Sequence, residues 1–363
     1  MVLVERPLRS KTKDKRYFNP LNQVDMNKKF YAMMIGAAAV MMMLLPSCGG
    51  KKYHANKGEV FGTYYNVQYE CDEDLHGAIE DCLLAFDNSL SVFNPNSIIS
   101  KINRNEEVET DPYFEAMYAE AMHISEISQG AFDITVAPLV NLWGFGFEHK
   151  EQVTQERIDS LLKLANFLGI NLVDHHIYKR DPRIMIDASA LAKGYACDVI
   201  AGMLADKGCE NYLVDIGGEI VAKGLNKKGQ KWQVGITKPI DDVTGSVQEL
   251  QDILEVNDIH MATSGNYRNY YVINGERRSH TIDPRTGYPV HHNLLSATVV
   301  ARNCMRADAL ATTCMVMGEV QAMELIEETE DAACYFIIAD NNKMYVKTSS
   351  RWQELFENNV EKD

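Results

Sequence analysis

Hydrophobic residues recur along this chain with two periods, one typical of helices and the other typical of strands. Apolar positions three or four residues apart predict helices over residues 75–90, 112–129, 155–169, 190–208 and 305–318. Alternating runs rich in β-branched and aromatic residues predict strands over residues 58–70, 211–218, 218–224, 231–237, 267–273 and 295–301, and a hairpin over 333–349. Because helices and antiparallel hairpins mix without strict β-α-β alternation, the pattern predicts an α+β fold rather than a doubly wound parallel sheet.

Local signals bound the fourth helix and the domain as a whole. Ser189 is predicted to cap the start of that helix, and Gly208 its end. No segment reads as a linker between separate cores. The sequence therefore predicts one compact domain over residues 58–358, followed by a short tail at 359–363.

The N-terminus carries a targeting pattern. Two lysines precede an apolar run that ends in the stretch "LPSC", whose last residue is Cys48. Basic and apolar regions in this order are typical of a signal peptide, and "LPSC" resembles a bacterial lipobox, in which the cysteine is lipidated. The sequence therefore predicts a signal-peptide region at 1–47, with Met26 as an alternative start, and a lipidated tether at 48–57 that holds the protein on the periplasmic side of a membrane. The alternative is a single membrane-spanning anchor, for which an apolar stretch of about 17 residues is short.

Charge and cysteine spacing exclude some classes of function. The chain has 36 Lys and Arg against 51 Asp and Glu. Residues 1–47 hold eight and three of these, so the remainder carries 28 basic and 48 acidic side chains, a net charge of −20. Such an acidic chain disfavours nucleic-acid binding, which needs a basic footprint, and an anionic ligand would need a cation to offset repulsion. The eight cysteines include no Cys-x-x-Cys pair, so a zinc or thioredoxin-type site is unsupported.

The stretch "SHTIDPRTGYP", residues 279–289, is predicted to be a rigid polar loop. Pro284 and Pro289 fix their own backbone angles and remove two donors, while Gly287 can take a positive φ. The segment before it is predicted to be a hairpin with Asn274-Gly275 as its type I′ turn. A rigid loop that carries a histidine and an aspartate is a candidate site, and an ordinary turn is the alternative.

Two further stretches have residue types that suit a nucleotide. Residues 130–146 are predicted to be irregular, and their Phe132 and Trp143 can stack on a ring or can equally be core aromatics. In residues 186–198, Lys193 lies near the start of a predicted helix. A lysine beside the positive end of a helix makes a phosphate site, although a capped helix with a solvent-facing lysine would show the same pattern.

Two shorter motifs complete the candidate chemistry. Gly217-Gly218 permits close approach of the backbone to a ligand, but tight turns need glycine too, and the motif is not the Gly-x-Gly-x-x-Gly of a Rossmann site. Asp308 and Thr312 are four residues apart and share one helical face. A carboxylate and a hydroxyl are hard oxygen ligands suited to Mg²⁺. A surface aspartate and an ordinary helix threonine are the alternative.

Taken in order, these motifs resemble one family, the ApbE-type FAD:protein FMN transferases. The resemblance spans nearly the whole chain after Cys48. It rests on the ordered set "FGTYY", "SLSVFNPNSIISKIN", "GAFDITVAPLVNLWGFG", "DASALAKGYACD", "DIGGEI", "ATSGNYRNYY", "SHTIDPRTGYP" and "ADALAT". The family implies a single compact α+β domain, T-fold-like, with mixed helices and antiparallel sheets.

The resemblance also implies a reaction and its residues. Such enzymes bind FAD and Mg²⁺ and attach the FMN half, through its phosphate, to a threonine or serine of an acceptor protein, releasing AMP. Position by position, the implied flavin contacts are Phe61, Phe93, Ala131, Phe132, Asp133, Asp187, Lys193 and Ile282. The implied metal ligands are the Ala190 carbonyl, Asp308 and Thr312, with Ala311 adjacent. One departure is Phe61, where the family often has methionine.

On this resemblance the rigid loop at 279–289 encloses the scissile pyrophosphate. His280 is a candidate proton shuttle because an imidazole titrates near neutral pH. Asp283 is its rival, either as the base or as the group that orients His280, and the sequence does not choose between them.

Two other functions fit the same residues. One is a Mg²⁺-dependent FAD pyrophosphatase that gives FMN and AMP. The other is a lipid-anchored flavin-binding protein without catalysis. The candidate metal ligands Asp308 and Thr312 argue against it, because a protein that only binds flavin has little need of them. The chain lacks the Ser/Thr-Gly-Ala-Ser/Thr acceptor motif of such targets, which disfavours self-modification. The implied partner is a separate protein that carries this motif, a membrane electron-transport subunit.

Overall fold

The protein was analysed as a computed structural model. The structure describes residues 52–145, 153–239, 249–266, 270–273, 276–341 and 343–357. The predicted signal-peptide region, Cys48, the Asn274-Gly275 turn and the tail at 359–363 lie outside the described residues. No helix in the described part of the chain combines the length and apolar character that crossing a membrane requires.

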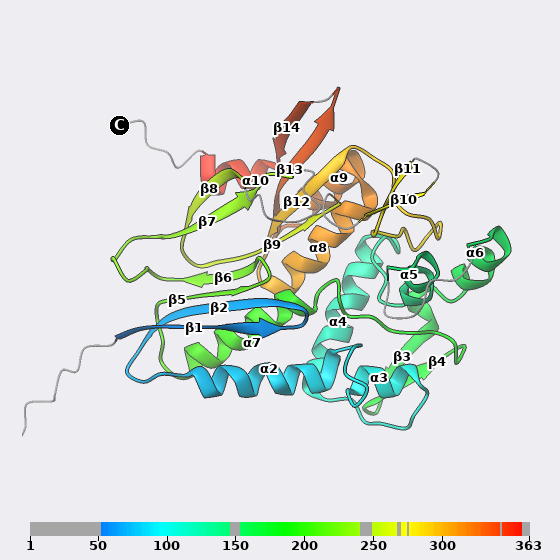
Figure 1. Ribbon diagram of the computed structural model, residues 1–363, viewed down its shortest axis with the longest axis horizontal. Helices are drawn as coiled ribbons and strands as arrows, with labels where there is room; N and C mark the ends of the chain where they lie inside the picture. Colours follow the sequence, from blue (N-terminus) through cyan, green and yellow to red (C-terminus); the bar gives the residue numbers. More distant parts are fainter. Residues whose placement is uncertain are drawn as a thin grey trace, which may run out of the picture. The chain divides into compact units, whose positions relative to one another are not determined.

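Eight of the described strands form one sheet, in which every neighbouring pair is antiparallel (Figure 1). In spatial order they are β1 (Lys52–Val60), β2 (Thr63–Cys71), β5 (Tyr212–Ile216), β6 (Glu219–Lys223), β9 (Ile259–Gly265), β12 (Leu294–Val300), β13 (Ala333–Asp340) and β14 (Lys343–Thr348). Two-stranded hairpins are formed by β3 (Ile170–Val173) with β4 (His176–Lys179), β7 (Trp232–Thr237) with β8 (Leu250–Val256), and β10 (Tyr270–Ile273) with β11 (Glu276–Ser279).

The helices lie between and beside these strands. The longer ones are α2 (His76–Leu90), α4 (Pro112–Ile127), α7 (Ala192–Asp206), α8 (Cys304–Met317) and α9 (Glu319–Glu328). The shorter ones are α3 (Ile98–Asn103), α5 (Ala137–Trp143), α6 (Gln155–Leu162), η1 (Phe167–Gly169), α10 (Ser350–Trp352) and η2 (Gln353–Glu357). Helices together with an antiparallel sheet confirm the α+β class.

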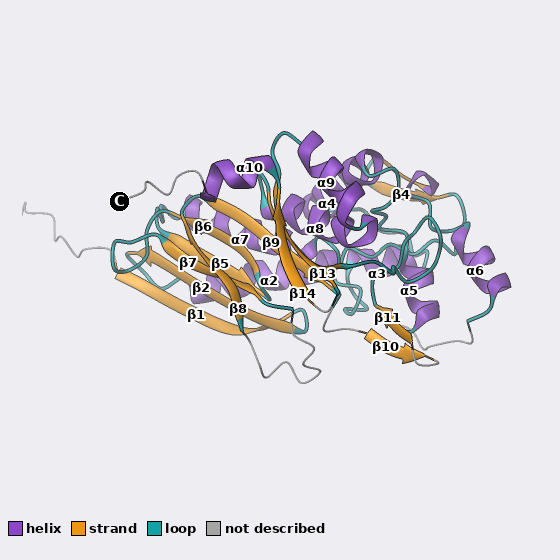
Figure 2. Cartoon of the chain, turned by 90° about the horizontal axis from the view of Figure 1, so that it is seen from above, coloured by secondary structure: helices purple, strands orange, loops and turns teal. Residues whose placement is uncertain are grey.

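Both faces of the central strands are buried. Successive residues along a strand point to opposite faces and so join different cores. On β13, Cys334 and Phe336 join the core formed with the helices, whereas Tyr335 and Ile337 join a second core formed with the β7–β8 hairpin and α10 (Figure 2). Because side chains alternate across a strand, a strand covered on both faces becomes a continuous apolar run. This explains the unbroken "ACYFII" stretch in the first strand of the predicted hairpin, which is apolar throughout instead of alternating.

The N-terminal strand prediction was wrong in detail. Residues 58–70 were expected to form one strand, but they form a hairpin that turns at Phe61 and Gly62, both of which have positive φ. Strand β1 begins at Lys52, so most of the predicted tether at 48–57 belongs to the fold. This edge strand was missed because Asn56 is its one buried side chain, so it lacks an apolar pattern.

Three other local predictions need correction. The helix expected over 155–169 ends at Leu162, and the chain continues through the short turn η1 into β3. The segment 130–146 was expected to be irregular, but α5 occupies its second half. Ser189 does not cap α7, because its hydroxyl donates to Asp187 instead. Gly208 does follow the end of α7 with a positive φ, as expected.

Candidate active site

A cavity of about 450 Å³ collects side chains from seven separate parts of the chain. Its walls come from the loop between α2 and α3, the segment from the end of α4 through α5, the approach to α7 with its first turn, the start of β6, the end of β9, the loop after β11 and one face of α8. Of the residues predicted to form the site, eleven line it: Phe93, Ala131, Phe132, Asp133, Asp187, Ala190, Lys193, His280, Ile282, Asp308 and Thr312. The fold therefore brings together residues that lie up to 219 positions apart in the sequence, from Phe93 to Thr312.

Helices α7 and α8 meet closely at Gly194. A Cβ at this position would lie 2.2 Å from the Cys304 carbonyl oxygen and 2.8 Å from the Asp308 Cβ, so only glycine fits. The Gly194 N–H donates to Asp308 Oδ2 at 3.0 Å. Gly194 belongs to the first turn of α7, whose N–H groups have no acceptor within the helix. No backbone N–H of a described residue donates to the Ala190 carbonyl, which precedes this turn.

A second contact between the two helices fixes the position of α8. The Asp198 carboxylate, on α7, accepts hydrogen bonds from the backbone N–H groups of Cys304 and Met305 at 2.9 and 2.8 Å. These amides belong to the first turn of α8, where N–H groups lack partners within the helix. A carboxylate there also suits the positive end of the helix dipole. Asp198 thereby holds Asp308, one turn further along α8, beside the start of α7.

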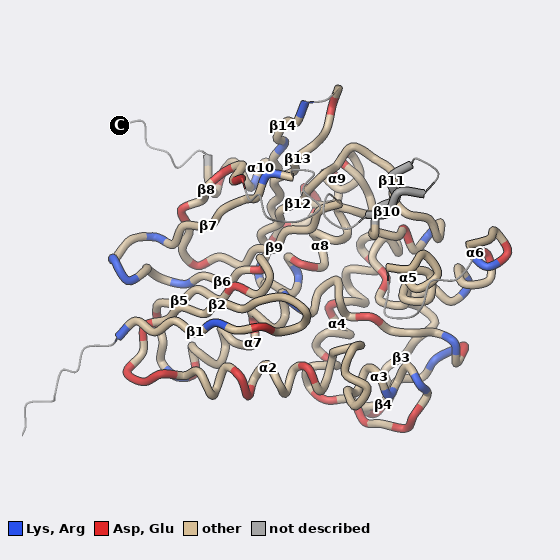
Figure 3. The backbone as a smooth tube through the Cα atoms, viewed as in Figure 1, with Lys and Arg blue, Asp and Glu red and all other residues tan. Residues whose placement is uncertain are grey.

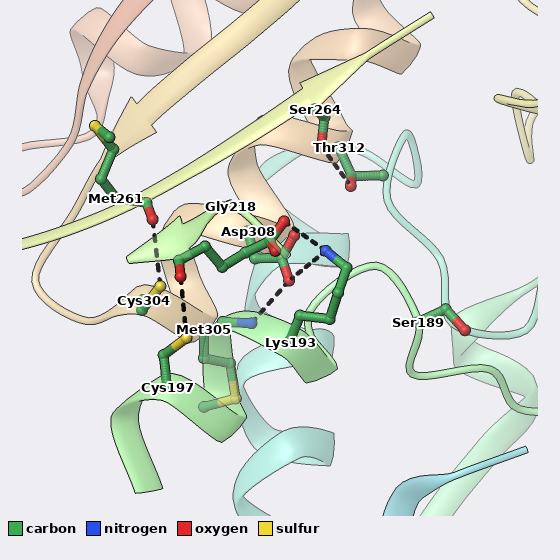
Figure 4. Close-up of polar contacts among 12 residues, drawn as sticks. Ser189, Lys193, Cys197, Gly218, Met261, Ser264, Cys304, Met305, Asp308 and Thr312 are labelled. Carbon is green, nitrogen blue, oxygen red and sulfur yellow. Dashed lines mark hydrogen bonds and ion pairs between the residues drawn. The ribbon is translucent and has the colours of Figure 1, made fainter. Parts of the chain in front are cut away.

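Lys193 lies between two buried carboxylates (Figure 4). Its Nζ is 2.5 Å from Glu219 Oε1 and 3.9 Å from Asp308 Oδ2. Burial opposes the charged form of Lys193, but attraction to Asp308 and Glu219 outweighs it and raises the pKa of the amine. Figure 3 shows acidic and basic positions side by side where α7, β6 and α8 meet. This wall therefore presents a permanent cation between two acids.

Burial raises the pKa of both acids, against the opposing effect of Lys193. For Glu219 the pKa rises to about 8. One oxygen of this carboxylate, Oε2, is buried and has no hydrogen-bond partner among the described residues. A buried carboxylate with an unused oxygen is a group that a bound cation or a donor can satisfy.

The donor set around Asp308 suits a hard divalent cation. Thr312 follows one helical turn later, and its Oγ1 lies 3.2 Å from Ser264 Oγ on β9. With the Ala190 carbonyl, this gives a carboxylate, a hydroxyl and a backbone oxygen on neighbouring walls. Mg²⁺ is held by few protein oxygens and keeps several waters. Among the described residues, no three His, Cys, Asp or Glu side chains cluster as a metal site.

The loop after β11 has the predicted rigid shape. The Asp283 carbonyl accepts from the N–H groups of Thr286 and Gly287, and Gly287 has a φ of 76°. The Trp143 Nε1–H donates to the Gly287 carbonyl at 2.9 Å, which fastens the loop to α5. A Cβ at Gly287 would lie 2.8 Å from Ile158, so the close packing here requires glycine.

The structure separates the two candidate proton carriers. His280 lines the cavity beside the ring of Phe145, at 6.4 Å between ring centroids. Asp283 is not among the lining residues. Its carboxylate accepts three hydrogen bonds from Arg285, two from the guanidinium and one from the backbone N–H, at 2.9 to 3.0 Å. The geometry therefore supports His280 and gives Asp283 a role in the turn.

Two of the predicted flavin contacts have their carboxylates occupied locally. Asp133 accepts hydrogen bonds from the backbone and hydroxyl of Thr135 and from the Phe167 N–H. Asp187 accepts from the backbone and hydroxyl of Ser189. Burial raises the pKa of both acids, and these hydrogen bonds oppose that rise. Both side chains shape the cavity wall by holding its turns.

Three predicted residues stand apart from the cavity. Phe61 is in the β1–β2 turn, with its ring centroid 5.6 Å from that of Phe86, and is not among the lining residues. Ala311 is fully buried inside α8 and does not line the cavity either. Asp283 is the third. Trp143, considered as a stacking ring, is a buried residue of a small core with α6, in line with the core alternative.

The comparisons with known proteins agree with this geometry. The model of the ApbE family matches residues 61–336. This chain belongs to the ApbE family. Among curated relatives, a protein of Haemophilus influenzae named FAD:protein FMN transferase is 36% identical, covering 90% of this chain and 98% of the relative. One of Vibrio cholerae with the same name is 34% identical, covering 86% and 96%.

Solved structures give the same result for the ApbE fold. The flavin transferase ApbE of Vibrio cholerae superposes with a TM-score of 0.75 at 34% identity, covering 84% of this chain and 99% of that one. The apo flavinyl transferase ApbE of Pseudomonas stutzeri also gives 0.75, at 30% identity, covering 84% and 97%. The family was therefore correctly identified from the sequence motifs.

Sequence reasoning missed several residues that line the cavity of this ApbE-family chain. The missed residues are Phe145, Ser189, Glu219, Thr263, Ser264, Gly265, Thr281 and Pro284 with the apolar Ile134, Val136, Val140, Met315 and Val316. Glu219 had a signal, since it directly follows Gly217-Gly218. Ser264 lies within the "ATSGNYRNYY" motif, but only the pairing of β9 with β12 and the hydrogen bond to Thr312 show where it lies in the cavity.

Proposed function

We propose that this protein transfers the FMN moiety of FAD to a threonine or serine hydroxyl of an acceptor protein and releases AMP. Family membership supports this reaction, since its relatives bear the name FAD:protein FMN transferase. The observation that carries the proposal is the meeting of Lys193, Asp308, Thr312 and His280 on one cavity. These residues supply a cation, oxygen ligands and an imidazole where a pyrophosphate would react.

The metal of this proposal is Mg²⁺, held by Asp308, Thr312 and the Ala190 carbonyl. The hard oxygen donors fit such an ion, and the Ala190 carbonyl accepts no backbone hydrogen bond from the described residues. When bound, Mg²⁺ offsets negative charge on the pyrophosphate. Lys193 adds a second positive charge on the same wall, which the net charge of the chain makes necessary.

The remaining chemistry falls to His280 and the rigid loop. In the proposed transfer the acceptor oxygen forms a bond to the phosphorus of the FMN half. The bond from that phosphorus to the bridging oxygen breaks, and AMP leaves with the electron pair. The imidazole of His280 accepts the proton of the hydroxyl. Pro284 and Gly287 hold the loop in place, and a misplacement of about 1 Å can reduce the rate about a hundredfold.

The acceptor and the location are proposed together. Lipidation of Cys48 would anchor the protein to a bacterial membrane, facing the periplasm, which is where a membrane electron-transport subunit presents its extracytoplasmic loops. The proposed acceptor carries a Ser/Thr-Gly-Ala-Ser/Thr motif. The "LPSC" stretch and the family membership support this placement.

Incubation of the purified protein with FAD, Mg²⁺ and an acceptor containing this motif tests the proposal. Transferase activity predicts covalent flavin fluorescence on the acceptor and stoichiometric AMP. AMP and free FMN without a labelled acceptor would instead establish a pyrophosphatase. Binding of FAD without turnover, in the presence of both metal and acceptor, would establish a flavin-binding protein. An acceptor with alanine in place of its last Ser/Thr is the matched control.

A further inference from the structure

Glu219 is a buried acid of the cavity that none of the proposed steps uses. It is the first residue of β6 and follows the Gly217-Gly218 turn. Its Oε1 pairs with Lys193 Nζ at 2.5 Å, and its backbone carbonyl accepts from Cys197 Sγ at 3.2 Å. Both contacts are to α7, so β6 and α7 together fix where this carboxylate lies.

We propose that Glu219 is a positioning residue that holds the Lys193 ammonium away from Asp308 and so keeps the Asp308 carboxylate available to the metal. This inference rests on the proposed function, because it assumes the Mg²⁺ site at Asp308. It assigns to Glu219 no contact with the metal itself.

Two distances show how Glu219 keeps the Lys193 ammonium apart from Asp308. The Lys193 ammonium is 3.9 Å from Asp308 Oδ2, which is within ion-pair range but beyond a direct hydrogen bond. Closing about 1 Å of this gap would make a charge-assisted hydrogen bond. The lysine stem is flexible, and Glu219 Oε1 at 2.5 Å holds its end on the other side. Without that carboxylate, Asp308 would be the acid left beside the ammonium.

Competition for the oxygens of Asp308 is the second step. Oδ2 already accepts the Gly194 N–H at 3.0 Å. A lysine bound to the same carboxylate would place a positive charge against the metal and occupy lone pairs that the metal needs. By pairing with Lys193, Glu219 leaves the neutral Gly194 amide as the hydrogen-bond donor to Asp308 among the described residues.

The cost of keeping Glu219 buried is the third step. It is 3% exposed, and only one of its two oxygens has a hydrogen-bond partner among the described residues. A buried, half-satisfied carboxylate disfavours folding. Stability is therefore a poor reason for an acid at this position. Glutamine would keep the shape without the charge.

The experiment measures Mn²⁺ binding by electron paramagnetic resonance, with and without FAD, on the full chain. The variants are Glu219→Gln, Lys193→Met and the double variant. Glu219→Gln should weaken Mn²⁺ binding by about tenfold, at the low end of the effect of outer-shell partners, while its melting temperature stays at or above that of the wild type. In the Lys193→Met background the same substitution should change the dissociation constant by less than about threefold, because no ammonium remains to be held.

The outcomes separate this inference from the proposed function. Equal weakening of Mn²⁺ binding in the wild-type and Lys193→Met backgrounds would mean that Glu219 acts only by its charge. Unchanged Mn²⁺ binding in Glu219→Gln would mean that Glu219 does not keep Lys193 away from Asp308. Either result overturns the inference while leaving the metal site in place. Wild-type protein that binds no Mn²⁺ in either condition would overturn the metal assignment and this inference with it. Glu255→Gln, an exposed change of equal charge on β8, is the control and should bind as the wild type does.

Discussion

The backbone amide of Gly194 donates to the carboxylate of Asp308 across the interface between α7 and α8, at 3.0 Å. The contact requires glycine, because a Cβ at residue 194 would lie 2.2 Å from the Cys304 carbonyl oxygen. It joins the segment that carries Lys193 and Ala190 to the helix that carries Asp308 and Thr312. The metal-type site therefore depends on the close approach of two helices.

Gly194→Ala should separate the two helices and destabilise the protein. Overpacking at a site without space costs about 1–3 kcal/mol of unfolding free energy, and more where backbone must move. Urea unfolding measures this directly. Gly202→Ala on the same helix is the matched control, since a Cβ there meets nothing within 4 Å, and it should stabilise by about 0.5–1 kcal/mol. Equal stability of the two variants would contradict the packing argument.

Removal of the charged metal ligand should have the larger effect on turnover. Asp308→Ala should lower Mg²⁺-dependent transfer by about a hundredfold or more, since a bound metal contributes several kcal/mol to a charged transition state. Thr312→Ala should cost about tenfold and be partly rescued by high Mg²⁺, because a neutral ligand contributes less. Kinetics against Mg²⁺ concentration distinguish the two. Full activity of Asp308→Ala in the presence of a chelator would remove the metal assignment.

His280→Ala should slow the chemistry far more than it weakens FAD binding. Loss of a positioned proton carrier lowers the rate by roughly 10²–10⁴-fold. Single-turnover labelling and FAD titration measure the two effects separately. Asp283→Asn should have a smaller effect on labelling, since its carboxylate is held by Arg285 in the turn. Wild-type turnover by His280→Ala would move the catalytic role to another group.

Because of Lys179, the free energy of unfolding should change with pH in the alkaline range. Its amine donates to the carbonyls of Ile102 and Ile184 at 3.0 and 2.9 Å, and burial lowers its pKa from 10.5 to about 8. Between these two values the unfolded chain binds more protons than the folded one, so the Lys179 contribution to stability should rise with pH across that window. Below about pH 8 both states are protonated and the contribution levels off.

Urea unfolding at pH 7.5 and 10 tests this contribution. The unfolding free energy of the wild type minus that of Lys179→Met should be larger at pH 10 than at pH 7.5. Lys227→Met, which removes a lysine side chain from an exposed turn, is the control for the substitution itself. A pH-independent difference for Lys179→Met would show that burial does not lower the pKa of its amine in the folded protein.

Cys48 should carry the lipid and form the N-terminus of the mature protein. Cys48→Ala should leave the precursor uncleaved or release the protein from the membrane, and mass spectrometry of the mature chain measures both outcomes. A wild-type chain that retains residues 30–47 with an unmodified Cys48 would show that this segment is an anchor or is not processed.

The sequence alone determined the elements that have a local physical signature. The amphipathic periods of α2 and α4 and the rigid turn with Gly287 each follow from nearest neighbours in the chain. The family followed from the order of motifs. The limit of local reasoning shows at β1, whose side chains carry no apolar pattern, and at the end of α6, where η1 and β3 interrupt a helical period.

Only the tertiary structure decided which charged groups meet. Lys193, Glu219 and Asp308 are distant in sequence and become neighbours because Gly194 lets α7 contact α8 while β6 passes the start of α7. The same packing brings His280 to the cavity and leaves Asp283 to Arg285, although both are in one short loop. Sequence separation says nothing about such distances, because burial and electrostatic attraction act through space once distant segments have packed.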